Sequence, residues 1–191
     1  MATIIQTVAN LPSVDPERIG VVSYSYGITM SSGTLARYPD LPVRFLIDWE
    51  GPADREDTTH GCEPDVGGIG SIEGMSACDD EAFWSQREAL TFIEQIKVPY
   101  QRLQSEKDHA QPDNSHAIDM INAAISGGVP FVRLNEYPPG QTYDQNDPPE
   151  MMPEDLEKRL EIMIIRFAYE LFSLPYAISY PETASIRVAI F

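Results

Sequence analysis

Basic side chains are scarce in this sequence of 191 residues. It contains 13 Lys and Arg residues against 30 Asp and Glu residues, which gives a formal net charge of −17. Proteins that bind nucleic acids or anionic membranes need basic patches, because binding displaces counterions from the phosphates. The charge therefore predicts that neither nucleic acid nor a membrane is a partner.

Long hydrophobic runs are also missing, and none approaches the roughly 18 residues of a membrane span. The first twenty residues have neither the basic region nor the small-residue cleavage site of a signal peptide. The hydrophobic fraction of 42% is enough for a core, and the length suits one domain of ordinary size. We expect a soluble, cytoplasmic globular protein.

Cysteine occurs only twice, as Cys62 and Cys78 in one glycine-rich stretch. Two cysteines exclude a disulfide-rich scaffold, and the lack of a nearby Cys/His set argues against structural zinc. The two residues either stay free thiols in a reducing cytosol or close a single loop, and a disulfide across such a loop stabilises by about 3 kcal/mol.

Segments typical of buried strands alternate with helix-like segments along the chain. The strand-like segments are 18–23, 43–49, 98–104 and 131–135, and the helix-like ones are 3–11, 27–37, 81–96 and 115–125. This alternation predicts an α/β fold with a mainly parallel sheet. After a proline-rich stretch, a C-terminal amphipathic helix is predicted, with one apolar stripe formed by Leu156, Leu160, Met163, Ile164, Phe167 and Leu171. Residues 186–191 are strand-like but have no evident place.

The sharpest local signal is Ser25, which follows the first buried strand and precedes a helix. The pattern Ser23-x-Ser25-x-Gly27 is that of a nucleophile elbow, a strained turn that lifts a serine Oγ above the sheet and needs small neighbours. The N–H of Tyr26, at the start of the following helix, is placed to bind an oxyanion. The alternative interpretation is an ordinary Ser/Gly turn at the end of a strand.

A second signal is Asp108, which comes shortly after the third strand and directly before His109. Functional groups gather at the carboxyl ends of parallel strands, so Asp108 and Ser25 are expected on the same edge of the sheet. An aspartate there can orient a histidine during acyl transfer. A turn or capping aspartate is the alternative interpretation.

Together these segments resemble the α/β hydrolases, in particular the dienelactone-hydrolase-like and prolyl-oligopeptidase-like acyl hydrolases. The stretch from Val14 to Gly27 resembles the family pattern VDPxRIGVxGxSxGG, and the stretch from Pro99 to Pro112 resembles PxLxxxGxxDxxVP, with Ser105 in place of its glycine. The resemblance covers roughly residues 1–135. It implies that Ser25 is the nucleophile and Asp108 the acid.

The histidine departs from this family pattern. The family places it in the loop after the eighth strand, which here reads Asn135 to Gly140 and contains none. The three histidines are His60, His109 and His116, and we expect His109, with His116 as the alternative, to reach Ser25 as the base. The resemblance also implies four earlier strands and a second oxyanion N–H, which this chain lacks.

A third cluster of polar residues follows the second strand: Asp48, Glu50, Asp54, Glu56, Asp57 and His60. Carboxylates in such a group suit a hard cation. The spacing does not match an EF-hand loop, however, and we predict neither a metal nor another cofactor. Glu50 also follows a strand end and is an alternative acid for the triad.

These features lead us to expect a serine-dependent acyl hydrolase of an ester, small amide or peptide, which uses Ser25, His109 and Asp108 with the Tyr26 N–H. Residues 1–137 would form an incomplete α/β-hydrolase core with an insertion at 51–80, residues 138–153 a connector, and residues 154–191 a C-terminal helix and tail. We expect the insertion to act as a lid, and Trp49, Phe83 and Trp84 to line an apolar pocket. The alternative is a catalytically inactive hydrolase-derived fragment that serves as a binding or oligomerisation module.

The first strand is expected at an edge of the sheet, because the strands that flank it in the family are absent. A bare apolar edge strand pairs readily with another chain. We therefore predict a homodimer. A separate partner, or residues 186–191 folded back as a strand, are the alternatives.

Overall fold

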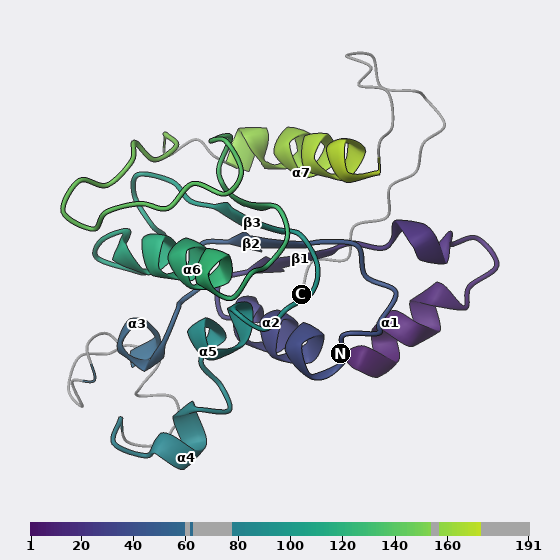
Figure 1. The fold of residues 1–191 in the computed structure, drawn as a ribbon, viewed down its shortest axis with the longest axis horizontal. Helices are drawn as coiled ribbons and strands as arrows, with labels where there is room; N and C mark the ends of the chain where they lie inside the picture. Colours follow the sequence, from purple (N-terminus) through teal and green to yellow (C-terminus); the bar gives the residue numbers. More distant parts are fainter. Residues whose placement is uncertain (60–61, 63–77, 154–156, 173–191) are drawn as a thin grey trace.

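The computed structural model describes residues 1–59, 62, 78–153 and 157–172, and its centre is a sheet of four parallel strands (Figure 1). The strands lie side by side in chain order: β1 (Val21–Tyr24), β2 (Leu46–Trp49), β3 (Tyr100–Leu103) and β4 (Val132–Leu134). Parallel neighbours need crossover connections, which here contain the helices α2 (Gly27–Arg37), α5 (Ala89–Ile93) and α6 (Ser115–Ser126). The predicted α/β fold with a parallel sheet is confirmed.

Helices cover both faces of the sheet. One hydrophobic core joins the strands to four helices: α1 (Ala2–Ala9), α2, α5 and α6. The buried residues of this core include Ile28, Leu46, Ile93, Tyr100 and Ile118. Helix α7 (Glu157–Leu171) lies on the opposite side of the sheet from α2 and α5 (Figure 1). Four residues of its predicted stripe are buried there against strand residues such as Val22 and Ile47: Leu160, Met163, Ile164 and Phe167. Leu171 is partly buried against the same cluster, and Leu156 lies outside the described residues.

The single helix predicted over residues 81–96 is wrong. Two short helices occupy this segment, α4 (Glu81–Trp84) and α5, and they are separated by residues 85–88. The Glu88 carboxylate binds Arg55 with an Nε–Oε1 distance of 2.5 Å, and the Leu90 N–H donates to the Ala53 carbonyl at 2.8 Å. These tertiary contacts replace the hydrogen bonds that would continue a helix.

The polar segment after β2 contains a helix that the periodicity missed, α3 (Arg55–Thr59). Asp54 caps it by accepting from the N–H groups of Glu56 and Asp57, at 2.8 and 3.2 Å. At the other end of the long insertion, Cys78 is disulfide-bonded to Cys62 with a Cα–Cα distance of 5.8 Å, which is the loop-closing alternative. The strand-like segment 186–191 and the interior of the expected lid, 63–77, lie outside the described residues.

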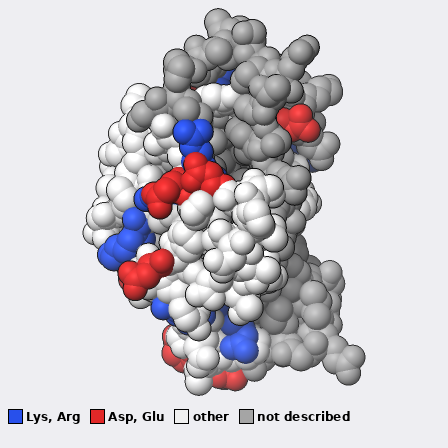
Figure 2. Space-filling view, turned by 90° about the vertical axis from the view of Figure 1, so that its right-hand side faces the viewer, with Lys and Arg blue, Asp and Glu red and all other residues white. Residues whose placement is uncertain are grey.

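The surface carries both signs of charge. On the face shown in Figure 2, Lys and Arg side chains lie beside Asp and Glu side chains rather than gathering in a separate patch. Among the described helices, none is long and apolar enough to cross a membrane. Cytoplasmic localisation stays a prediction.

Candidate active site

The carboxyl ends of the first three strands are aligned, so the residues that follow them share one edge of the sheet. The register pairs Tyr24 with Trp49 and Trp49 with Leu103. One step further, the Ser25 N–H donates to the Trp49 carbonyl at 2.9 Å, and the Glu50 N–H donates to the Leu103 carbonyl at 3.1 Å. Ser25 and Glu50 therefore leave the sheet from neighbouring positions.

Both of these residues adopt left-handed backbone conformations, with φ of 53° at Ser25 and 48° at Glu50. This conformation costs a residue with a Cβ roughly 1–2 kcal/mol, and such strain tends to cluster at functional sites. Gly51 permits the close approach of the two turns, because a Cβ there would lie 2.7 Å from the Ser25 carbonyl oxygen and 2.4 Å from Ile28. The strained turn predicted at Ser25 is therefore matched by a second one on the adjacent strand.

His109 joins the two turns through its ring. Its Nε2 lies 2.9 Å from the Ser25 Oγ, and its Nδ1 lies 3.2 Å from Oε2 of Glu50 and 3.4 Å from Oδ1 of Asp108. Ionised carboxylates only accept hydrogen bonds, so the proton of a neutral imidazole belongs on Nδ1. Nε2 is then free to accept the Ser25 proton. The Tyr24 ring packs against the imidazole with a centroid distance of 4.8 Å, and Trp49 packs against Tyr24 at 4.4 Å.

Asp108 is buried and accepts four hydrogen bonds from its own loop and its surroundings. Oδ1 accepts from the N–H groups of Ala110 and Gln111, both at 2.8 Å, and Oδ2 accepts from Gln104 Nε2 at 2.9 Å and lies 3.2 Å from His116 Nε2. Burial alone raises the pKa of a carboxyl group. Here the hydrogen bonds from His116, Gln104, Gln111 and Ala110 outweigh it and hold the pKa of Asp108 well below its usual range.

The other predicted residues are placed as follows. Tyr26 is the N-cap residue of α2, directly beside Ser25, and its oxyanion role stays a prediction. His116 is fully buried, and its Nε2 bonds to Asp108 rather than to Ser25. His60 lies outside the described residues. Trp84 belongs to the buried interior, where it packs against Phe83.

Glu50 is 5% exposed, and both of its carboxylate oxygens are engaged. Oε1 accepts from the N–H of Ser105 at 3.2 Å and from the Ser105 hydroxyl, while Oε2 faces His109. Ligand atoms of Glu50, Asp108 and His109 lie within 4.8 Å of one another, close enough to hold an ion. The hydrogen bonds already use most of their lone pairs, so we add no metal to the prediction.

A buried polar network beneath the site was missed at the sequence level. Arg102 on β3 is fully buried and donates to Asp48 Oδ2, to the Gly51 carbonyl at 2.7 Å and, from Nη2, to Gln104 Oε1 at 2.6 Å. Burial lowers the pKa of Arg102, but the Asp48 carboxylate outweighs this effect and raises it. The sequence carried no signal for this pair, because only the register of the folded sheet brings Asp48 beside Arg102.

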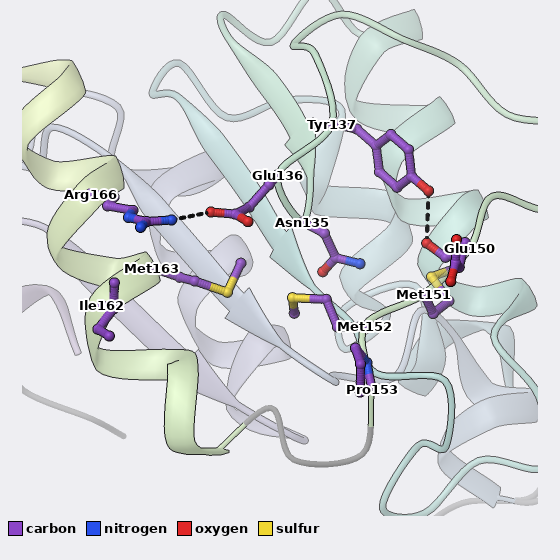
Figure 3. A pocket seen from close by; sticks show the side chains of 10 residues that line it. All are labelled: Asn135, Glu136, Tyr137, Glu150, Met151, Met152, Pro153, Ile162, Met163 and Arg166. Carbon is purple, nitrogen blue, oxygen red and sulfur yellow. Dashed lines mark hydrogen bonds and ion pairs between the residues drawn. The ribbon is translucent and has the colours of Figure 1, made fainter.

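One cavity of about 520 Å³ lies between α7 and the chain that follows β4 (Figure 3). Figure 3 shows Ile162, Met163 and Arg166 on its helical side, opposite Asn135, Glu136 and Tyr137. Its lining contains neither Ser25 nor His109. It is therefore separate from the contact between Ser25 and His109.

No family model and no curated protein matches the sequence, but solved structures match the fold. Puromycin hydrolase superposes with a TM-score of 0.65 at 17% identity, over 94% of this chain and 26% of its own. Pyrococcus horikoshii acylaminoacyl peptidase superposes with a TM-score of 0.58 at 17% identity, over 93% of this chain and 28% of its own. Porphyromonas gingivalis dipeptidyl peptidase 4 superposes with a TM-score of 0.59 at 16% identity, over 90% of this chain and 22% of its own.

These neighbours are α/β hydrolases, and the chain has a part of their fold. It spans about a quarter of the length of the structures that it matches. The likeness in fold predicted from the motifs at Ser25 and Asp108 is confirmed. At sequence identities of 16–17%, this likeness establishes the architecture alone.

Proposed function

We propose that this protein is a serine-dependent acyl hydrolase, with Ser25 as the nucleophile and His109 as the general base. The observation that carries the proposal is the 2.9 Å contact between the Ser25 Oγ and Nε2 of His109. A serine at a strained strand-to-helix turn, paired with a histidine whose other nitrogen faces buried carboxylates, is the arrangement of an activated nucleophile.

The reaction proceeds through an acyl-enzyme. The Ser25 oxygen attacks the carbonyl carbon of the substrate while its proton passes to Nε2 of His109. The Tyr26 N–H binds the resulting oxyanion, and His109 then returns the proton to the leaving amine or alcohol as the C–N or C–O bond breaks. Water attacks the acyl-serine with the same proton relay, which releases the acid and regenerates Ser25.

Short peptides and amides are the substrates we favour over other esters. Three of the similar structures are named as a puromycin hydrolase, an acylaminoacyl peptidase and a dipeptidyl peptidase, and these names denote peptidase or amide-cleaving activities. At the site, Tyr24 is 37% exposed, and its ring packs beside His109 and offers an apolar surface to a substrate side chain. An ester with a good leaving group suits the same chemistry and is a convenient reporter.

Labelling with a fluorophosphonate probe tests the proposal, because the probe reacts only with an activated serine. We expect Ser25→Ala to abolish labelling, His109→Ala to lower its rate by at least about 100-fold, and the exposed control Ser126→Ala to keep the parental rate. Release of a fluorescent amine from short aminoacyl substrates then defines the preferred acyl group. Folded protein that is never labelled would instead support the alternative, an inactive binding or oligomerisation module.

A further inference from the structure

We infer that Glu50, and not Asp108, is the carboxylate that orients His109, and that Asp108 anchors the loop that carries this histidine. The inference rests on the proposed function and deepens it. Glu50 acts through the imidazole rather than on the substrate, so it is a positioning residue.

The geometry at Nδ1 of His109 separates the two carboxylates. The Glu50 contact, at 3.2 Å, satisfies hydrogen-bond geometry, whereas the Asp108 contact is an ion-pair distance of 3.4 Å. Oδ1 of Asp108 already accepts two backbone N–H groups at 2.8 Å. A carboxylate offers about four lone-pair positions, and the four donors around Asp108 fill them. Oε2 of Glu50 faces His109 instead.

Glu50 is held in place for this role. Its Oε1 accepts from the N–H and the hydroxyl of Ser105, and that hydroxyl also lies 2.7 Å from the Lys107 carbonyl in the loop before His109. Its backbone is left-handed, and the carboxylate is almost completely buried. A strained, buried and charged residue persists only where its surroundings compensate it.

Two departures from the family pattern thus belong together. Ser105 stands where the pattern has glycine, and its hydroxyl adds a hydrogen bond to Glu50 that a glycine could not make. The histidine stands at position 109, within the same loop, rather than between Asn135 and Gly140. Asn135 is instead occupied, since its Oδ1 accepts from the Gln104 N–H at 2.9 Å and its Nδ2 donates to the Gln104 carbonyl at 3.0 Å.

The position of the imidazole proton decides between Glu50 and Asp108. In Glu50→Gln the amide oxygen stays with the two Ser105 donors, so the amide NH₂ faces His109 Nδ1. The histidine must then accept at Nδ1 and carry its proton on Nε2, where it cannot take the Ser25 proton. In Asp108→Asn the loop loses a buried anchor, but Glu50 still accepts from Nδ1.

The experiment is long-range ¹H–¹⁵N NMR of the histidine side chains, which reports the protonated nitrogen and needs no catalysis. His109→Ala assigns the signal. We expect the neutral ring of the parent and of Asp108→Asn to carry the proton on Nδ1, and that of Glu50→Gln to carry it on Nε2. Glu56→Gln, which changes an exposed carboxylate in α3, serves as the matched control and leaves the parental signal.

Probe labelling provides the second readout. We expect Glu50→Gln to slow it by about 10²- to 10⁴-fold, Glu50→Asp to restore part of the rate, and Asp108→Asn to lower the unfolding temperature with at least tenfold less effect on labelling than Glu50→Gln. If Glu50→Gln fails to fold, Ser105→Gly decides, with an expected loss of about tenfold.

A proton that stays on Nδ1 in Glu50→Gln, or that moves to Nε2 in Asp108→Asn, overturns the inference. So does Ser105→Gly labelled at the parental rate. A parent that is never labelled but shows the expected proton shift contradicts the proposed function while the role of Glu50 in orienting His109 stands.

Discussion

The buried ion pair between Asp48 and Arg102 should be the most sensitive point of the structure outside the hydrophobic core. Both side chains are completely inaccessible to solvent, and Arg102 also donates to the Gly51 carbonyl and to Gln104. The replacement Arg102→Met keeps most of the volume and removes every one of these donors. Among the described residues, the Tyr100 hydroxyl at 3.1 Å is then the remaining hydrogen-bond partner of the buried Asp48 carboxylate.

The expected loss follows from these contacts. Removing one partner of a buried ion pair costs about 3–5 kcal/mol. The Gly51 and Gln104 oxygens lose buried hydrogen bonds worth about 1 kcal/mol each, and burial of the Met side chain returns about 1–2 kcal/mol. The free energy of unfolding should therefore fall by about 3–6 kcal/mol. For a protein of this length, that lowers the unfolding temperature by roughly 6–24 °C.

Urea unfolding followed by tryptophan fluorescence measures this loss. Arg18→Met is the control, because the Arg18–Asp15 pair is 3.4 Å apart with both side chains about half exposed, and such pairs contribute about 0–1 kcal/mol. The double variant Asp48→Asn/Arg102→Met should be more stable than Arg102→Met alone, since it no longer buries an unpaired charge. A loss below about 1 kcal/mol in Arg102→Met, equal to that of the control, would refute the reasoning.

Three further predictions concern acid, redox state and assembly. The pKa of Asp108 is lower in the folded state, so Asp108 contributes to the free energy of unfolding above a pH of about 4, and this contribution is lost on acidification. Urea midpoints between pH 3 and 7 should therefore show the difference in stability between the parent and Asp108→Asn narrowing as the pH falls. Cys62 and Cys78 close a loop with a sequence separation of 16, so Cys62→Ser/Cys78→Ser should lower the free energy of unfolding by about 3 kcal/mol. Mass spectrometry of the unreduced protein should show the loss of two hydrogens, and two freely alkylated thiols would contradict the disulfide. Within the described part of the chain β1 pairs only with β2, and the homodimer predicted through this edge should be seen by light scattering at micromolar concentration; a monomer that persists without residues 186–191 would exclude it.

The fold was predictable because its signals are local. Apolar runs for the strands and a helical stripe ending in Phe167 and Leu171 depend on residues close together in the chain. The turn at Ser25 was also predictable, since Ser23 and Gly27 are small and stand at fixed spacing around it. The two segments that resemble the family pattern then added Ser25 and Asp108 as candidate nucleophile and acid.

Contacts between distant residues were not predictable in the same way. The interruption between α4 and α5 arises because Arg55 binds the Glu88 carboxylate from 33 residues away in the sequence. Periodicity within residues 81–96 contains no trace of this partner. Likewise, each charge of the Asp48–Arg102 pair is unremarkable in its own strand, and only the register shows that they are neighbours.

The ambiguity between the two acids of the site has the same origin. Asp108 and Glu50 both follow strands, and both reach His109 Nδ1, so residue type and position rank them equally unless a family pattern is added. What distinguishes them is which donors surround each one. The loop N–H groups, Gln104 and His116 fill the lone pairs of Asp108, whereas Ser105 holds one oxygen of Glu50 and leaves the other for His109. On our inference, the orienting carboxylate comes from the end of β2 rather than from the loop after β3, and a left-handed turn at Glu50 together with the Ser105 side chain holds it there.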